Sequence, residues 1–278
     1  KMKFPPHPVG YVAAEPRAAL EILEERAQAA QGDLAQRDDV GAALLQYLAE
    51  NGAPATRRAV AANIFTPASA NRLLADDEQE EVRAELAVKI ARLMPELSQR
   101  EGAHFYALTI ETLECLARDC AVRVRAILAD EIKHLDCIPR AVAQLLARDV
   151  ETMVAAPILE YSPLLSDQDL MEIVTFAKVN EVLTAVAKRK NLSARISDAI
   201  VASLDIPAIA ALLLNSGAEI RAQTLNRIIN DAENIDAWHG PLALRSDLSA
   251  RAIRRVAAFV GASQIEQLAA RHGLDEAT

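Results

Sequence analysis

Apolar residues recur along this chain at steps of three and four, which is the spacing of one face of an α-helix. The clearest stripe consists of Val82, Leu86, Ile90 and Leu93, set among charged residues. Pro95 follows, and we expect it to end that helix because proline lacks a backbone N–H. Runs of alternating apolar and polar residues, typical of strands, are absent from the sequence. The pattern predicts helix throughout.

Similar periodic stretches predict further helices, most of them bounded by Pro, Gly, Asn or Asp. They lie at residues 16–30, 40–50, 104–118, 122–135, 140–147 and 218–229. Ala and Leu, both strong helix formers, make up about a third of the 278 residues, and 51% of all residues are hydrophobic. A chain of this composition buries a large core, so it is not a disordered protein.

One short pattern repeats along the chain. An Asp or Asn that closes one helix is followed, after four residues, by Val, Ile or Thr and then usually by Arg. The five copies are Asn51 with Thr56-Arg57, Asp77 with Val82-Arg83, Asp119 with Val124-Arg125, Asp149 with Val154-Ala155, and Asn215 with Ile220-Arg221. Two further copies start at Asn191 and Asp247 and read almost identically. Neighbouring copies lie 24 to 42 residues apart, which predicts a helical repeat.

Helix capping gives this pattern a physical reason. An Asp or Asn in the turn can accept hydrogen bonds from N–H groups at the start of the next helix. We expect the Val or Ile to enter the core and the Arg to bond back to the Asp or to a neighbouring carbonyl. A single helical hairpin cannot bury its apolar faces alone, so neighbours must stack. The predicted fold is all-α, an α-α superhelix (α-solenoid) of about seven irregular helical-hairpin units.

The repeated Asp-x4-Val-Arg pattern resembles the HEAT and armadillo class of repeats from about residue 40 onward. A narrower resemblance, over roughly residues 70–270, is to a bacterial family called domain of unknown function 2336. It rests on residues 145–149, 154–165, 169–170, 185–189, 214–220 and 241–248. This resemblance implies a HEAT-like helical fold and no assigned activity. The sequence departs from the pattern at Ala155, where other units carry Arg. It departs also in the first 35 residues, which we expect to form a helical cap on one continuous solenoid, residues 36–278.

The charge distribution limits the kinds of partner that we expect the chain to bind. Lys and Arg number 30 against 39 Asp and Glu, a net charge of −9, and most of the acidic excess lies before residue 178. Because nucleic-acid binders normally carry a basic excess, we expect no nucleic-acid partner. Three cysteines do not form a disulfide framework, and residues 1–8 lack the apolar run of a signal peptide. The longest apolar stretch, residues 206–214, is too short to cross a bilayer. We expect a cytoplasmic protein that does not insert into membranes.

Known catalytic motifs are missing from the sequence. Glycines are too far apart for a phosphate-binding loop, and neither a Gly-x-Ser-x-Gly nor a His-Glu-x-x-His motif occurs. Two weak metal patterns remain: the Glu-x-x-His pairs Glu101 with His104 and Glu131 with His134, and a loose set of Cys115, Cys120, His134 and Cys137. We interpret the histidines as solvent-facing or helix-end residues and the cysteines as buried thiols. We therefore predict no metal and no cofactor.

Four residues are candidate binding residues. Arg189, within a basic triplet, has a repeat equivalent in Arg245, 56 residues on. If both project from one edge, they line a groove for an acidic peptide or a phosphate group; alternatively, they offset the dipoles of their helices. Tyr161 and Trp238 are aromatic residues that either anchor a partner at the surface or pack between units.

These observations favour a non-catalytic protein–protein interaction scaffold or adaptor. One alternative is a regulatory or sensory module of a signalling system, whose N-terminal helices cap the repeats or form a dimer. Another is an enzyme that uses a HEAT-like cradle to act on nucleic acid or a cofactor, which requires a continuous basic groove.

Overall fold

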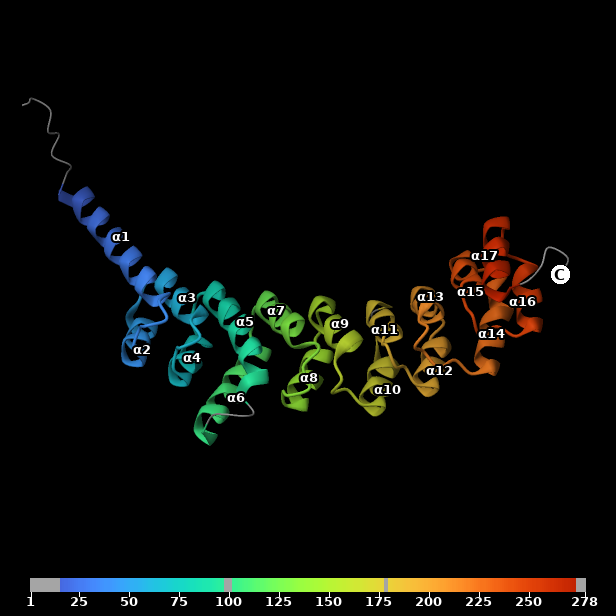
Figure 1. Ribbon diagram of the computed structural model, residues 1–278, viewed down its shortest axis with the longest axis horizontal. Helices are drawn as coiled ribbons and strands as arrows, with labels where there is room; N and C mark the ends of the chain where they lie inside the picture. The colour runs from blue at the N-terminus through green and yellow to red at the C-terminus, as the bar shows by residue number, and fades with distance from the viewer. Residues whose placement is uncertain (1–15, 98–101, 178–179, 274–278) are drawn as a thin grey trace, which may run out of the picture. The chain divides into compact units, whose positions relative to one another are not determined.

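The computed structural model describes residues 16–97, 102–177 and 180–273, and nearly all regular structure in these ranges is α-helical (Figure 1). They form seventeen α-helices and one 3₁₀-helix, η1 (Asp236–Trp238), and contain no strand. A single isolated bridge pairs the backbones of Leu192 and Ala218. The predicted all-α, solenoid-like fold is confirmed.

The helices divide between two compact units. The first unit comprises residues 1–90 and 102–112, and the second comprises residues 91–101 and 113–278. The first six helices are α1 (Pro16–Ala35), α2 (Ala42–Asn51), α3 (Pro54–Ala62), α4 (Ala68–Leu74), α5 (Glu80–Leu97) and α6 (Ala103–Ala117). By sequence, α5 and α6 contribute residues to both units. The predicted division into a cap and a single solenoid stays a prediction, although its boundary at residue 35 coincides with the end of α1.

The second unit continues with shorter helices joined by tight turns. They are α7 (Val122–Ile132), α8 (Arg140–Ala147), α9 (Thr152–Tyr161), α10 (Asp167–Phe176), α11 (Asn180–Ala187), α12 (Ala194–Ala202), α13 (Ile206–Leu214), α14 (Ala222–Ala232), α15 (His239–Ala243), α16 (Ala250–Ala257) and α17 (Ala262–His272). No helix in the described part of the chain is long and apolar enough to cross a bilayer.

Helices of this second unit pack in two alternating layers. Odd-numbered helices contact one another in succession from α7 through α9, α11, α13 and α15 to α17. Even-numbered helices do the same from α10 through α12 and α14 to α16. In the first unit, α1 packs against α3 and α2 against α4. Each hairpin thus buries its apolar faces against its neighbours, as a stacked repeat requires.

The core is aliphatic. On α9, Val154, Ala155, Ile158 and Leu159 are completely buried, so the alanine that replaces the repeat arginine fills space against neighbouring helices. On α5, Val82, Leu86 and Ile90 are buried as predicted. Burial of such side chains contributes roughly 1.5–3 kcal/mol each.

Several helix boundaries differ from the predicted ones; α1 runs on to Ala35, and α7 ends at Ile132. Helix α5 continues through Pro95 to Leu97, and Met94 is buried where Leu93 was expected to be. The last predicted helix starts at Ala222 instead of residue 218, because the backbone of residues 217–219 bonds to Leu192 and is not helical. Leu192 N–H donates to Gly217 O at 3.3 Å, and Glu219 N–H donates to Leu192 O at 2.9 Å. These bonds hold residues 217–219 extended beside the turn of the previous hairpin.

The Asp and Asn residues of the repeat pattern close the turns, but they do not cap the next helix as expected: no side chain caps α7, α9 or α14. The side-chain Oδ1 atom accepts a hydrogen bond from the N–H two residues on in four turns: Asp77 from Gln79 at 2.9 Å, Asp119 from Ala121 at 2.8 Å, Asp149 from Glu151 at 2.9 Å, and Asn215 from Gly217 at 2.9 Å. Asn51 is the exception among the five main copies. It donates its amide to Tyr47 O at 3.0 Å and is exposed.

The repeat arginines bond forward as well as back. Arg57 donates to Gly52 O in its own turn and, through two nitrogens at 2.6 and 3.1 Å, to the Asp77 carboxylate of the following turn. Arg125 does the same with Asp119 O at 2.7 Å and with Asp149 at 2.6 and 3.1 Å. The expected bond back to the Asp or to a neighbouring carbonyl is thus present. The forward pairs with Asp77 and Asp149, which join successive turns, were not predicted.

Arg83 likewise donates to Asp77 O in its own turn at 2.6 Å. The arginine that deviates is Arg221. Arg221 lies before α14, outside the helix, and forms an ion pair with Asp198 on α12. The shift of the α14 start removes Arg221 from the position that Arg125 occupies inside α7.

Candidate binding site

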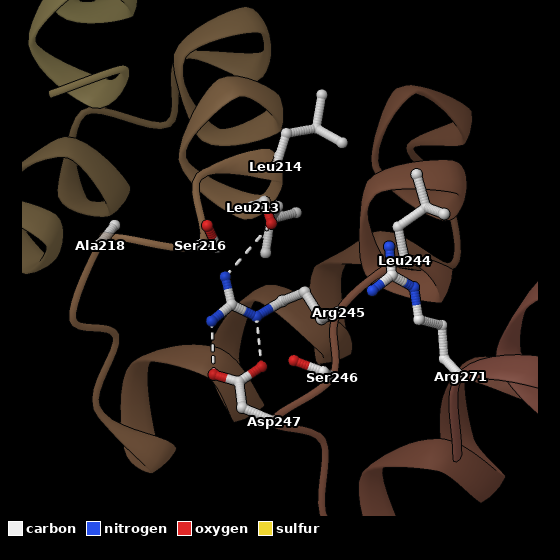
Figure 2. Close-up of a pocket in the computed structure, with 9 residues that line it drawn as sticks. All are labelled: Leu213, Leu214, Ser216, Ala218, Leu244, Arg245, Ser246, Asp247 and Arg271. Carbon is white, nitrogen blue, oxygen red and sulfur yellow. Dashed lines mark hydrogen bonds and ion pairs between the residues drawn. The ribbon is translucent and has the colours of Figure 1, made fainter. Parts of the chain in front are cut away.

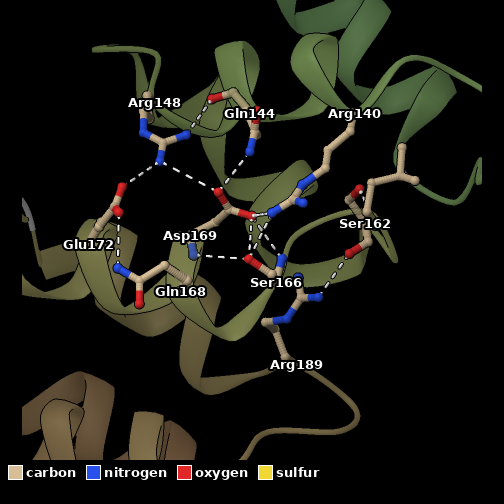
Figure 3. A network of polar contacts seen from close by, with 10 residues as sticks. Arg140, Gln144, Arg148, Ser162, Ser166, Gln168, Asp169, Glu172 and Arg189 are labelled. Atoms are coloured by element: carbon tan, nitrogen blue, oxygen red, sulfur yellow. Dashed lines mark hydrogen bonds and ion pairs between the residues drawn. The ribbon is translucent and has the colours of Figure 1, made fainter.

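The two predicted binding arginines lie at the ends of α11 and α15, where they bond to the preceding odd-numbered helix. Arg189 donates to Leu159 O at 2.6 Å and to Ser162 O at 2.8 Å, both at the end of α9 (Figure 3). Burial lowers the pKa of Arg189, which has no carboxylate in direct contact among the described residues. Its hydrogen-bonding groups are thus occupied by the C-terminal carbonyls of a neighbouring helix, where a cation offsets the helix dipole.

Arg245 is buried and is held in a similar way. It donates to Leu213 O at 3.2 Å and, through Nε, to Asp247 at 2.7 Å, with a second bond from Nη2 to the same carboxylate. The hydrogen bonds from Arg245 lower the pKa of Asp247. This pair keeps Arg245 in one position without a ligand.

A pocket of about 400 Å³ opens at this point of the second unit (Figure 2). The turns after α13 and α15 supply most of its lining, and Arg271 on α17 lies on another side of it. Leu214 and Leu244 line it while remaining 57% and 38% exposed. The complete lining is Leu213, Leu214, Ser216, Ala218, Leu244, Arg245, Ser246, Asp247 and Arg271. The pocket therefore combines a fixed polar floor with apolar side chains that face solvent.

Arg271 differs from Arg245 in its pairing. It is exposed, and no hydrogen bond or ion pair to another described residue holds its guanidinium. Asp247, the acid of the pocket, is already bonded to Arg245. The lining thus has one cation beyond its internal ion pair, which favours a ligand that carries an anionic group.

The two predicted aromatic anchors lie in different environments. Trp238 is 2% exposed and donates its indole N–H to Ile206 O at 3.0 Å, so it packs inside the second unit. Tyr161 is 46% exposed at the end of α9. Its ring lies 4.9 Å from that of His134, and Lys133 Nζ lies 5.4 Å from its centroid. Neither residue lines the pocket.

A second polar cluster surrounds Asp169 at the start of α10 (Figure 3). Its carboxylate accepts hydrogen bonds from Arg140 at 2.6 Å, from Gln144 at 2.8 Å and from the Ser166 hydroxyl at 2.7 Å. Burial opposes ionisation of Asp169, but these hydrogen bonds outweigh it and bring its pKa well below the ordinary range. Every oxygen of Asp169 is occupied by the protein, so the cluster joins α8 to α10 and offers no open site.

Sequence reasoning missed both Arg271 and Asp169 as site residues. Ser166 and Asp169 form a capping box, and the Ser-x-x-Asp spacing was the signal for it. Arg271 carries no motif, because its importance comes from a turn about 25 residues earlier that only the fold brings close.

Metal-ligand groups do not assemble in the described residues: no set of three or more His, Cys, Asp or Glu side chains is placed to hold an ion. Glu101 lies outside the described residues. Glu131 pairs instead with Arg92. The interpretation of the cysteines as buried thiols was wrong: Cys120 is exposed, and Cys115 and Cys137 are only partly buried, although burial still raises the pKa of the Cys137 thiol.

Stacked helical hairpins and a small polar pocket define the chain as an all-α, solenoid-like repeat protein. Residues 154–278 match the model of a family described as an uncharacterised protein conserved in bacteria (DUF2336). The predicted resemblance is thus confirmed over this part, whereas the expected span began near residue 70. No curated protein and no solved structure gives a match.

Proposed function

We propose that this chain is a non-catalytic protein-interaction scaffold that binds a partner segment in the pocket beside Arg271. The observation that carries the proposal is the mixed lining. Arg245 and Asp247 are fixed by each other, while Arg271, Leu214 and Leu244 remain open to solvent. A carboxylate next to an aliphatic side chain on the partner fits this combination.

The lining favours binding over catalysis. It contains no histidine or cysteine, and its one carboxylate is committed to Arg245. A general base needs a free position within hydrogen-bond reach of a substrate proton. The preformed pair Arg245–Asp247 instead gives a rigid floor, which reduces the entropy cost of binding a flexible segment.

Site-specific photocrosslinking in the native host tests the proposal. A photoreactive phenylalanine analogue replaces Leu244 at the mouth of the pocket, and a second chain carries it at Met153, which is 61% exposed on α9 and outside the pocket. We expect a discrete crosslinked protein from position 244 and none from position 153. Arg271→Gln should reduce the yield roughly tenfold, since it removes the unpaired charge without a change in burial.

Equal adducts from both positions, or an adduct that is unchanged by Arg271→Gln, would contradict a specific site in this pocket. Ser246→Ala serves as a matched control, because it alters another exposed lining residue without a change in charge. It should leave most of the adduct.

A further inference from the structure

Helices α12, α14 and α16 each carry exposed arginines, and α16 has no acidic residue to balance them. Exposed arginines occur on all three: Arg195 on α12, Arg227 on α14, and Arg251 and Arg254 on α16. We call these four residues the arginine face. None of them forms an ion pair or hydrogen bond with another described residue, and none lines the pocket.

Contacts between the helices show that this surface is continuous. Thr224 on α14 donates to Asp198 on α12 at 2.5 Å, and Arg221 pairs with the same carboxylate. Asp198 lies three residues after Arg195, and Thr224 lies three residues before Arg227, so both bridging residues are one helical turn from an arginine of the face.

The next pair of helices is joined in the same way. Arg255 on α16 donates to Asn230 on α14. Asn230 lies three residues after Arg227, and Arg255 lies four residues after Arg251, again about one turn away. The exposed sides of α12, α14 and α16 therefore form one surface from Arg195 to Arg254.

The arginines have few acids to balance them. On the three helices only Asp198 and Asp231 are acidic, and Asp198 is already bonded to Arg221 and Thr224. Arg251, Arg254 and Arg255 are spaced at i, i+3 and i+4, where like charges repel one another and destabilise a helix. Arg195 and Arg251 also lie in the first turns of their helices, where the helix dipole disfavours a cation. Arg254 and Arg255, in contrast, lie in the last turn of α16, where the dipole favours a cation. An anionic partner relieves the repulsion between the arginines of α16 and the unfavourable charge at Arg195 and Arg251.

We infer that the arginine face binds an acidic helical segment of a partner protein. Guanidinium groups pair bidentately with carboxylates, and arginines one turn apart match glutamates one turn apart on an opposing helix. A nucleic acid is disfavoured by the net charge of −9 and by the absence of aromatic residues from α12, α14 and α16. This inference does not depend on the pocket.

Fluorescence anisotropy with a synthetic helical peptide tests this inference. The labelled peptide carries glutamates at i, i+3, i+4 and i+7, and a matched peptide carries glutamines there. We expect the wild-type chain to bind the glutamate peptide and not the glutamine peptide. Arg251→Glu combined with Arg254→Glu should weaken binding roughly tenfold or more. The control variant, Arg26→Glu with Arg37→Glu, changes the same charge at two exposed arginines of the first unit and should stay within about twofold.

A charge-swap peptide separates recognition from misfolding. With lysines in place of the glutamates, it should bind the Arg251→Glu, Arg254→Glu variant and not the wild type. Circular dichroism should show an unchanged helix content, because Arg251→Glu improves the first turn of α16 while Arg254→Glu loses a favourable charge near its end. Equal binding of the glutamate and glutamine peptides overturns the proposal. So does a labelled DNA duplex that binds more tightly than the glutamate peptide at the same salt and is released by the double variant.

Discussion

Arg125 and Arg189 both reach across to the turn of a neighbouring hairpin, but they meet opposite environments there. Arg125 donates to the carboxylate of Asp149, and these hydrogen bonds raise the pKa of Arg125. Arg189 ends on two carbonyls at the end of α9, and burial lowers its pKa. The charge of Arg125 is thus balanced by a carboxylate, whereas the charge of Arg189 is balanced by the dipole at the C-terminus of α9.

The same division separates other turns of the chain. In the first unit, Arg57 pairs with the Asp77 carboxylate as Arg125 does with Asp149. We call this contact the ion-pair mode. In what we call the carbonyl mode, a side chain donates to main-chain carbonyls at the end of a neighbouring helix, as Arg189 does. Asn215 does so with Ala187 O at 2.8 Å and Arg189 O at 2.7 Å, at the end of α11. Asn63 does likewise at the end of α1, with Ala35 O at 2.8 Å. Positions that look equivalent in a repeat pattern can therefore stabilise the stack by different interactions.

The largest expected effect comes from removing each cation in turn. Arg125→Met leaves the half-buried Asp149 carboxylate and Asp119 O without their partner, and we expect a loss of about 3–4 kcal/mol in the free energy of unfolding. Arg189→Met leaves two neutral carbonyls unpaired and should cost about 2 kcal/mol. Urea unfolding of both variants measures the difference. Arg58→Met, at an exposed ion pair with Glu85, is the control and should cost less than about 1 kcal/mol. Equal losses for Arg125→Met and Arg189→Met would show that the two modes do not differ in energy.

The turns that contain Gly217 and Glu151 offer a second comparison. Gly217 and Glu151 each stand two residues after the capping Asx. A Cβ at Gly217 would lie 1.7 Å from Lys190 O, because the backbone passes close to the previous turn there. Gly217→Ala should cost about 2–3 kcal/mol and break the bridge between Leu192 and Ala218. Glu151→Ala, at an exposed residue, should cost less than about 0.5 kcal/mol, and thermal melts compare the two. A melting temperature unchanged by Gly217→Ala would mean that the turn can move apart without loss.

Sequence periodicity predicted the all-α fold and placed Asp77, Asp119 and Asp149 in turns, because both depend on local spacing. It did not place α3, α4 or α9 to α13 individually, and it expected the acids to accept from the start of the next helix instead of from an N–H two residues on. It did not predict which turn Arg125 reaches, since Asp149 lies in the next hairpin. The pocket was missed for the same reason: Arg245 was singled out, but Arg271 reaches it only through the packing of α15 against α17. The sequence also left open whether Trp238 lies at the surface or inside. Its burial depends on α13, where its indole N–H finds the carbonyl of Ile206.

Lys89 extends the carbonyl mode to a group that titrates. Its Nζ donates to Asn71 Oδ1 at 2.6 Å, Asn63 O at 3.1 Å and Val60 O at 3.3 Å, inside the first unit. Burial lowers the pKa of Lys89 to about 7, while the charge of Glu85 opposes this shift. The unfolded chain, with a lysine pKa near 10.4, then binds more protons between about pH 7 and 10. Stability should therefore rise with pH across this window, by an amount on the order of 2 kcal/mol.

Lys89→Met removes this titration and serves as the reference. Urea unfolding of both chains between pH 7 and 10 should show a difference that changes with pH. Three acceptors surround Nζ, and only an ammonium can donate to all three. A difference that stays flat across the window would mean that these acceptors keep the proton on Lys89.

The smallest effect concerns acid. Burial opposes ionisation of Asp149, but its hydrogen bonds with Arg125 and the Glu151 N–H outweigh burial and lower its pKa. The Arg125–Asp149 pair therefore contributes stability above the unfolded pKa of about 4, and this contribution is lost as the pH falls through the folded pKa. The stability difference between wild type and Arg125→Met should shrink by about 1 kcal/mol from pH 6 to pH 3, measured by urea unfolding. The difference between wild type and Arg189→Met should stay constant, because no carboxylate takes part. A parallel decline in both would place the acid sensitivity elsewhere in the chain and would remove the electrostatic distinction between the two kinds of turn.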